Sequence, residues 1–196
     1  MTTQALPTRR EVSVANEHRY DRRGAVRWVL SHVLRYKVYV FSFLVASTLT
    51  AALFSSVPAL TGRAFNEVLK PVPDPAQLTW IAVTMLAMVL LRGLTDIFSA
   101  FSIETLAQRL ERDAREELYI SLLGKSQTFH NRQRVGDIMA RASNDVRQLN
   151  PMLNPGVALI TDSMLSTLIP LIFIAFIDLR LLAPPLVFLA IFAFLL

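Results

Sequence analysis

The chain has 196 residues, of which 53% are hydrophobic and 18% are charged, and its formal net charge is +5. Soluble globular chains usually carry about 45–50% apolar and about 25% charged residues, so this composition favours a membrane protein. The chain contains no cysteine, which excludes disulfide scaffolds and thiolate metal sites. No aromatic residues interleave the basic ones as stacking sites require, so the charge does not indicate a nucleic-acid-binding protein.

The N-terminal region is polar and basic, with no apolar stretch of the signal-peptide type. We interpret residues 1–23 as a cytoplasmic tail. Residues 24–37 place apolar side chains at helical spacing among basic and aromatic ones: Val26, Val29, Leu30 and Val33. This pattern is typical of a helix that lies in the membrane interface, here called the elbow helix. The alternative is that these residues form the cytoplasmic end of the first span.

Four apolar runs follow, over residues 38–61, 76–103, 151–177 and 181–196. The first has no charged residue and would measure about 36 Å as a helix, enough to cross a hydrocarbon core of about 30 Å. The fourth has 16 residues, fewer than the ~20 that a spanning helix needs. We expect that the sequence stops inside this span; the alternative is a short terminal hairpin helix.

The basic residues indicate the orientation of the spans. Sixteen Lys and Arg residues fall in 1–37 and 104–150, whereas three fall in 62–75 and 178–180. Because cytoplasmic loops are enriched in Lys and Arg, we expect a multi-pass protein of the plasma (inner) membrane with a cytoplasmic N-terminus.

Residues 76–150 contain no proline, and a single helix from Leu78 to Ser126 would be about 73 Å long, longer than a whole bilayer of about 40–45 Å. An apolar stripe continues beyond the membrane: Ile103, Leu106, Leu110, Ala114, Leu118 and Leu122. Pairs at i,i+4 spacing predict ion pairs on the other faces: Arg109–Asp113, Glu111–Arg115 and Arg112–Glu116. We therefore predict a stiff cytoplasmic lever.

The returning segment has the same character. After a break predicted at Gly136, a second stripe comprises Ile138, Ala142, Val146, Leu149 and Leu153. Asp137 is a candidate helix N-cap, and Asp137, Arg141 and Asp145 are spaced for ion pairs along this second lever. The predicted fold is an all-α polytopic membrane helix bundle whose long helices extend into the cytoplasm, with levers and a connecting segment over 104–150.

A family becomes recognisable at the tip of the levers, where residues 129–146 read FHNRQRVGDIMARASNDV. This segment resembles the first intracellular loop of type IV ATP-binding-cassette (ABC) exporters. The matching positions are Phe129, Gly136, Asp137, Arg141, Asn144 and Asp145. The junction FIDLRLLAPPLVFLA over 176–190 also resembles that family, and the resemblance covers about 24–196.

The resemblance implies a six-span membrane domain, of which 38–196 would be the first part, working as a homodimer or heterodimer. It implies that a coupling segment contacts a nucleotide-binding domain, either later in the same chain or separate. The implied contact residues are Phe129, His130, Asn131, Arg132, Gln133, Arg134, Gly136 and Asp137. ATP and Mg²⁺ are expected in the complete transporter, whereas this segment carries no catalytic residue and binds no cofactor itself.

The segment departs from the family at NPMLNP, because Pro151 and Pro155 interrupt the entry to the third span and predict a kink there. Three charges lie within the spans: Arg92, Asp96 and Asp162. A charge in hydrocarbon costs about 2.5–3.5 kcal/mol, so Arg92 and Asp96 either form a structural pair or line the translocation pathway. For Asp162 we expect contact with a basic residue of another helix.

Other motifs carry less weight. Gly124-Lys125-Ser126 resembles the end of a phosphate loop, but Tyr119 stands where the first glycine is needed. The three histidines have no further metal ligands at suitable spacing, so no metal site is predicted. The alternative to a transporter is a non-transporting membrane sensor or scaffold whose cytoplasmic hairpin docks a partner.

Overall fold

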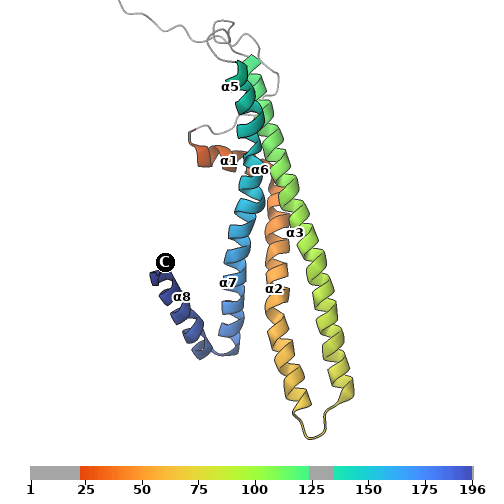
Figure 1. Ribbon diagram of the computed structural model, residues 1–196. Coiled ribbons are helices and arrows are strands. Elements are labelled where there is room, and N and C mark those ends of the chain that lie inside the picture. The colour runs from red at the N-terminus through yellow and green to blue at the C-terminus, as the bar shows by residue number, and fades with distance from the viewer. Residues whose placement is uncertain (1–22, 124–134, 196) are drawn as a thin grey trace, which may run out of the picture. The chain divides into compact units, whose positions relative to one another are not determined.

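The computed structural model describes residues 23–123 and 135–195. The described residues form helices and no strands (Figure 1). The α-helices are α1 (Ala25–Val33), α2 (Lys37–Val68), α3 (Pro75–Leu123), α5 (Val135–Ala140), α6 (Leu149–Pro151), α7 (Ala158–Ile177) and α8 (Ala183–Leu195). Short 3₁₀ or π segments cover Leu34–Tyr36, Arg141–Asp145, Met152–Val157 and Leu179–Leu182. The all-α prediction is confirmed.

The chain divides into two compact units. The first, here called the lever unit, comprises Met1–Val40 and Ile103–Gly156. The second, the span unit, comprises Phe41–Ser102 and Val157–Leu196. Helix α3 contributes residues to both units without a break.

In the span unit, α2 and α3 are joined by a proline-rich turn (Figure 1). Asp74 ends this turn, and its Oδ1 accepts a hydrogen bond of 2.9 Å from the backbone N–H of Ala76. Pro75 is the first residue of α3, where a missing N–H has no cost. On the other side of the turn, the Glu67 carboxylate accepts hydrogen bonds from Lys70 Nζ and from the backbone N–H of Asp74. These contacts fix a tight reversal between the two helices.

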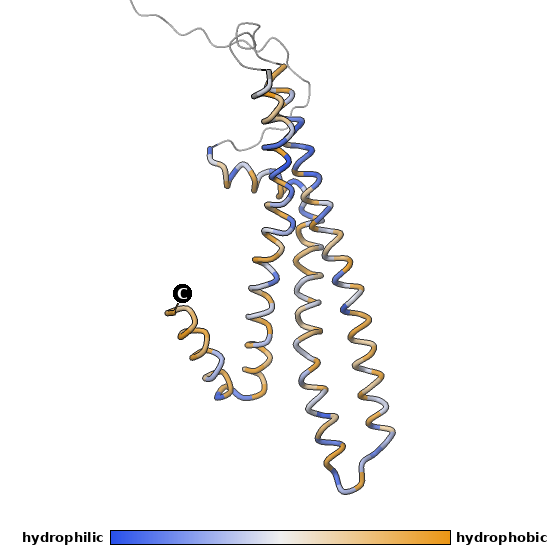
Figure 2. The backbone as a smooth tube through the Cα atoms, viewed as in Figure 1, coloured by the Kyte–Doolittle hydropathy of each residue, from blue (hydrophilic) through white to orange (hydrophobic). Residues whose placement is uncertain are grey.

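Three helical stretches are long and apolar enough to cross a membrane: Ala25–Val68, Pro75–Leu123 and Ile138–Ile177. The apolar stretch Leu179–Leu195 is shorter. Hydrophobic residues predominate along the span-unit helices, whereas hydrophilic ones gather along the C-terminal part of α3 (Figure 2). Within the most apolar stretch of α3, only 6% of the residues are buried by other described parts of the chain. The remaining surface therefore suits lipid or further helices, which confirms the predicted membrane bundle.

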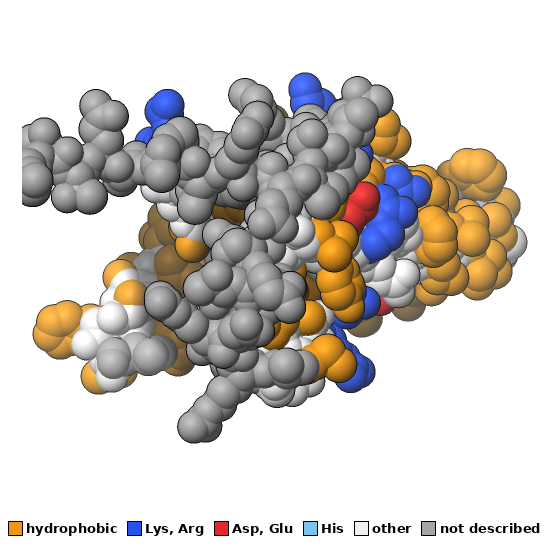
Figure 3. All heavy atoms as spheres, turned by 90° about the horizontal axis from the view of Figure 1, so that it is seen from above, with side chains coloured by type: hydrophobic (Ala, Val, Ile, Leu, Met, Phe, Trp, Pro, Cys, Tyr) orange, Lys and Arg blue, Asp and Glu red, His pale blue; other side chains and the backbone are white. Residues whose placement is uncertain are grey.

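The lever unit buries the predicted apolar stripes. On α3, Ile103, Leu106, Leu110 and Ala114 are 1–4% exposed. On the returning segment, Ala142 and Leu153 are buried, and Ile138, Val146 and Leu149 are partly buried. Seen from above, Lys and Arg side chains lie beside hydrophobic ones on the visible surface (Figure 3). The apolar positions that the helical spacing predicts are therefore the positions that are buried or partly buried in the lever unit.

The predicted kink before the third span is confirmed at Asn154, whose φ of −125° and ψ of 107° are not helical. Pro155 follows it and cannot donate the backbone hydrogen bond that a regular helix needs. The Asn154 side chain donates a hydrogen bond of 2.6 Å from Nδ2 to Glu104 Oε2 on α3.

Candidate functional site

The predicted coupling segment follows the first lever in the sequence, and most of it is not described by the structure. Phe129, His130, Asn131, Arg132, Gln133 and Arg134 lie outside the described residues. Gly136 and Asp137 lie inside α5, which has already begun by Val135. The break predicted at Gly136 and the N-cap predicted at Asp137 are therefore wrong. The side chains of Asp137 and Arg141 also lie outside the description, so the ion pairs of the second lever remain a prediction.

The elbow helix α1 docks on the first lever, which is the part of α3 from residue 104 to 123. Trp28 Nε1 donates a hydrogen bond of 2.9 Å to Glu117 Oε2. His32 is fully buried beside the Trp28 ring, with the ring centroids 4.3 Å apart. Its Nδ1 lies 3.0 Å from the Trp28 carbonyl oxygen, and its Nε2 lies 3.4 Å from Glu117 Oε2. Two aromatic side chains thus surround one carboxylate of the lever.

One helical turn earlier on α3, Asp113 forms a second docking point and is only 3% exposed. Its carboxylate accepts a hydrogen bond of 2.8 Å from the Tyr36 hydroxyl and lies 3.2 Å from Arg35 Nη1. Arg112 Nη2 approaches the other carboxylate oxygen at 3.1 Å. A buried carboxylate is stable only when donors surround it, and here two of the three come from the segment before α2.

The ion pairs predicted for the first lever are partly wrong. Glu111 and Arg115 do pair, with 2.5 Å between Oε1 and Nη2. Asp113 does not pair with Arg109, whose guanidinium lies 4.5 Å from the centre of the Tyr39 ring. In the described part of the chain, Arg112 pairs with Asp113 rather than with Glu116. For Asp113 and Arg109 the reason is competition, since Tyr36 and Tyr39 of a second segment replace the weak exposed pair within one helix.

The sequence does indicate that Asp113 needs a partner from another segment, although the i,i+4 spacing predicted a partner within the same helix. Asp113 is three residues after Leu110 and one before Ala114, so it lies on the buried stripe of the lever. A carboxylate on an apolar stripe requires a partner from another element. The aromatic and basic residues of 28–36 are the donors that such a carboxylate needs.

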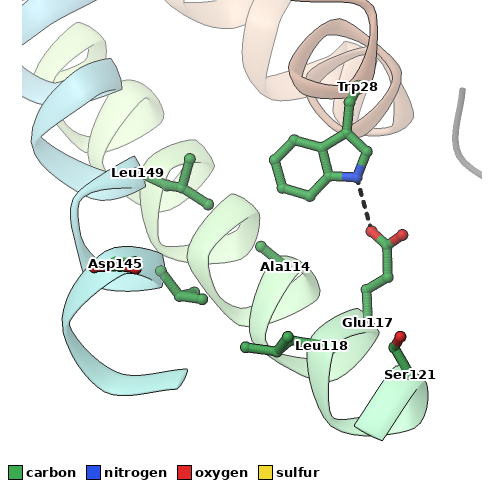
Figure 4. A pocket seen from close by; sticks show the side chains of 8 residues that line it. Trp28, Ala114, Glu117, Leu118, Ser121, Asp145 and Leu149 are labelled. Atoms are coloured by element: carbon green, nitrogen blue, oxygen red, sulfur yellow. Dashed lines mark hydrogen bonds between the residues drawn. The ribbon is translucent and has the colours of Figure 1, made fainter. Parts of the chain in front are cut away.

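The docked elbow helix leaves a cavity of about 440 Å³ within the lever unit. Its lining residues are Trp28, Ala114, Glu117, Leu118, Ser121, Asp145, Val146 and Leu149. Figure 4 shows the Trp28 ring and the Glu117 carboxylate on one side, with Leu149 and Asp145 contributed by the returning segment. The three helical segments of the unit therefore meet here around a mostly apolar space.

In the span unit, the charges predicted to pair do not do so. Arg92 and Asp96 are exposed, and within the residues that the structure describes they form no ion pair with each other. The Arg92 guanidinium instead lies over the Phe54 ring, 4.5 Å from its centre. Asp162 is exposed on α7 and pairs with no basic residue of the described chain, contrary to expectation. The structural-pair interpretation of Arg92 and Asp96 is therefore wrong, whereas a pathway role remains a prediction.

Helices α2 and α3 are joined in the apolar region by hydroxyl pairs that sequence reasoning did not identify. The Oγ atoms of Ser47 and Ser99 are 2.7 Å apart. The remaining pairs are Ser42–Ser102 at 2.9 Å and Thr50–Thr95 at 2.8 Å. Small hydroxyl residues let helices approach closely in lipid and hydrogen-bond across the contact. Each of these side chains also looks unremarkable alone, because isolated Ser and Thr are common in spans.

Long apolar helices and a charged helical extension define a multi-pass membrane protein. The profile described as the ABC transporter transmembrane region matches residues 38–196. The chain therefore belongs to the family of ABC transporter transmembrane regions.

Individual relatives agree with this assignment. An ATP-dependent lipid A-core flippase of Syntrophus aciditrophicus is 29% identical over 147 residues, which cover 74% of this chain and 23% of the relative. A protein of the same description from Chromobacterium violaceum is 26% identical over 52% of this chain and 18% of its own length. An uncharacterized ABC transporter ATP-binding protein of Bacillus subtilis is 24% identical over 74% of this chain and 24% of its own length. The chain thus spans about a quarter or less of the curated relatives that it matches.

Proposed function

We propose that this membrane part of an ABC exporter carries movements of a nucleotide-binding domain to the membrane spans through α3 and the returning segment. The continuity of α3 carries the proposal. It is a single helix of 49 residues that contains the apolar run 76–103 and the charged lever beyond it. The backbone hydrogen bonds of an α-helix are continuous along its length. A displacement at Leu123 can therefore be transmitted to the span, because no break in the helix absorbs the movement.

The contact with the nucleotide-binding domain would lie at Phe129–Asp137, where the two levers meet in sequence. Sixteen of the basic residues fall in 1–37 and 104–150, on the same side of the spans as this segment. Their enrichment supports a cytoplasmic position for the segment and for the N-terminus. ATP and Mg²⁺ would bind to the nucleotide-binding domain. A second membrane half, identical or different, would complete the translocation pathway.

The names of the flippase relatives suggest a class of substrate. Two of them act, by their names, on lipid A-core. We propose a lipid of this class as the first substrate to assay. The apolar surface that the spans leave exposed is compatible with a substrate that enters from the membrane.

The coupling proposal is tested by breaking α3 in the lever. Glu116 is exposed, and replacing it with proline removes one helical hydrogen bond and forces a kink, at a cost of about 3 kcal/mol. In the complete transporter reconstituted into liposomes, Glu116→Pro should keep basal ATP hydrolysis and lose ATP-driven lipid transport. Glu116→Ala, which keeps the helix, should retain both activities. Undiminished transport by correctly inserted Glu116→Pro would refute the lever mechanism.

The orientation is tested separately. Single cysteines at Arg132 and Gln133 should react with a membrane-impermeant thiol reagent only after the cytoplasmic side is opened. Labelling of intact cells from the outside would contradict the proposed topology.

A further inference from the structure

A cavity of about 340 Å³ lies in the span unit between α2 and α3, next to the turn that joins these helices (Figure 1). Helix α2 contributes Arg63, Asn66, Glu67 and Lys70 to its lining, and α3 contributes Gln77 and Trp80. Residues three, four or seven positions apart share one face of a helix, so a polar face of each helix borders the same space. This space is here called the hairpin pocket.

The carboxylate in the lining already has its partners. Glu67 is only 3% exposed. It accepts hydrogen bonds of 2.5 Å from Lys70 Nζ and of 3.2 Å from the backbone N–H of Asp74. A buried carboxylate is stable only when such donors hold it, so Glu67 and Lys70 neutralise each other as a fixed part of the wall.

Arg63 supplies the positive charge that remains. Its side chain is exposed, and it forms no ion pair within the residues that the structure describes. The side-chain amides of Asn66 and Gln77 are also exposed and donate no hydrogen bond to the described part of the chain. The guanidinium carries five N–H donors in a planar fork, and each amide carries two. The pocket therefore offers one cation and two neutral donor groups to a ligand that accepts hydrogen bonds.

We propose that the hairpin pocket binds a phosphate ester, with the phosphate oxygens at Arg63, Asn66 and Gln77. The arginine fork matches the oxygens of a phosphate in a bidentate manner. A terminal phosphate has three strong acceptor oxygens, enough for the guanidinium and both amides, whereas a carboxylate has two. The Trp80 ring lines the same pocket and provides an apolar surface for the organic part of the ester.

The size and the position of the pocket fit the headgroup of a lipid. Its volume is near the lower end of the range of about 300–1,000 Å³ for small-molecule sites, which suits a ligand group of headgroup size. The lining residues of α2 follow the uncharged run 38–61, at the end of the spans that is opposite to the lever on α3. Lipid headgroups flank the hydrocarbon core at such a boundary. A soluble phosphate ester shares the same chemistry, and the experiment below distinguishes the two sources.

The test measures occupancy of the pocket in the complete transporter without ATP. Thr84 also lines the pocket, and its hydroxyl donates to the Trp80 carbonyl oxygen, so it takes no part in the proposed contacts. The rate at which a small thiol reagent labels Thr84→Cys is measured in phosphatidylcholine nanodiscs, with any other cysteine of the transporter replaced. Phosphatidic acid, diacylglycerol with the same acyl chains and free glycerol 3-phosphate are added in separate series.

Phosphatidic acid should slow the labelling, whereas diacylglycerol, which lacks the phosphate, should not. Arg63→Gln should raise the amount of phosphatidic acid needed for half-protection by roughly ten- to a hundredfold, the loss expected for a hydrogen bond to a charged group. Equal protection by free glycerol 3-phosphate would identify a soluble ester as the ligand in place of a lipid.

The matched control is Arg180→Gln, which removes an exposed arginine of the span unit that does not line the pocket. It should keep the protection by phosphatidic acid. The proposal is overturned if neither phosphate ester protects, if diacylglycerol protects equally, or if Arg63→Gln and Arg180→Gln have the same effect. Failure to label Thr84→Cys in phosphatidylcholine alone would show that protein fills the pocket and would also overturn it. Because no transport is measured, these outcomes are independent of the coupling mechanism.

Discussion

Removal of the Asp113 carboxylate should release the elbow helix from the first lever. Asp113→Ala deletes the acceptor of the Tyr36 hydroxyl, a hydrogen bond to a charged group worth about 1.5–3 kcal/mol. The Arg35 pair adds less, about 0.5–1 kcal/mol, because that side chain is 41% exposed. Arg112 is 67% exposed and adds almost nothing. The expected total is about 2–4 kcal/mol of docking free energy.

Hydrogen exchange of the complete transporter in nanodiscs measures this loss directly. A change of about 3 kcal/mol should lower the protection of the backbone amides in 25–36 by roughly a hundredfold, because each 1.4 kcal/mol is a factor of ten. Glu111→Ala removes a partly buried carboxylate that pairs with Arg115 within the same helix, and it should leave that protection unchanged. If the amides of 25–36 keep their protection in Asp113→Ala, the carboxylate does not hold the elbow helix.

Three further substitutions test individual contacts by their effect on stability. Trp28→Phe keeps an aromatic ring but removes the N–H that reaches the lever, so docking of α1 should weaken by about 1.5–3 kcal/mol in the same exchange experiment; unchanged protection would contradict this. Ser47→Ala should lower the free energy of unfolding by only about 0.6 kcal/mol, the typical value of a hydrogen bond between membrane helices, and a loss several times larger would show that the hydroxyl has another role. Asn154→Ala leaves Glu104 without its 2.6 Å donor and should destabilise the lever unit by about 1–3 kcal/mol, measured by thermal unfolding with Asn154→Gln as a partial rescue.

The sequence predicted the spans and levers well, because both follow from periodicity and from the absence of charge or proline over long stretches. Residues 76–103 contain two charges in 28 positions, and no proline interrupts the helix up to Leu123. The buried stripe of the first lever was also predicted, since a long helix can bury only one face. The kink at Asn154 followed from the two prolines around it.

The contacts between segments were not predictable in the same way. Trp28 and Glu117 are 89 residues apart, and Tyr36 and Asp113 are 77 apart. Helical spacing says which residues share a face, but not which element covers that face. The i,i+4 rule therefore paired Asp113 with Arg109, whereas the fold supplies Asp113 with donors from the segment before α2.

The hydrogen bond between Asn154 and Glu104 has a mechanical consequence. Asn154 is a non-helical residue at the entry to α7, and Glu104 is the first charged residue after the apolar run of α3. The side-chain bond therefore holds the interrupted residue of the returning segment at the level of Glu104 on α3. Within the lever unit, this one contact fixes the axial register of the two segments where helical hydrogen bonding cannot.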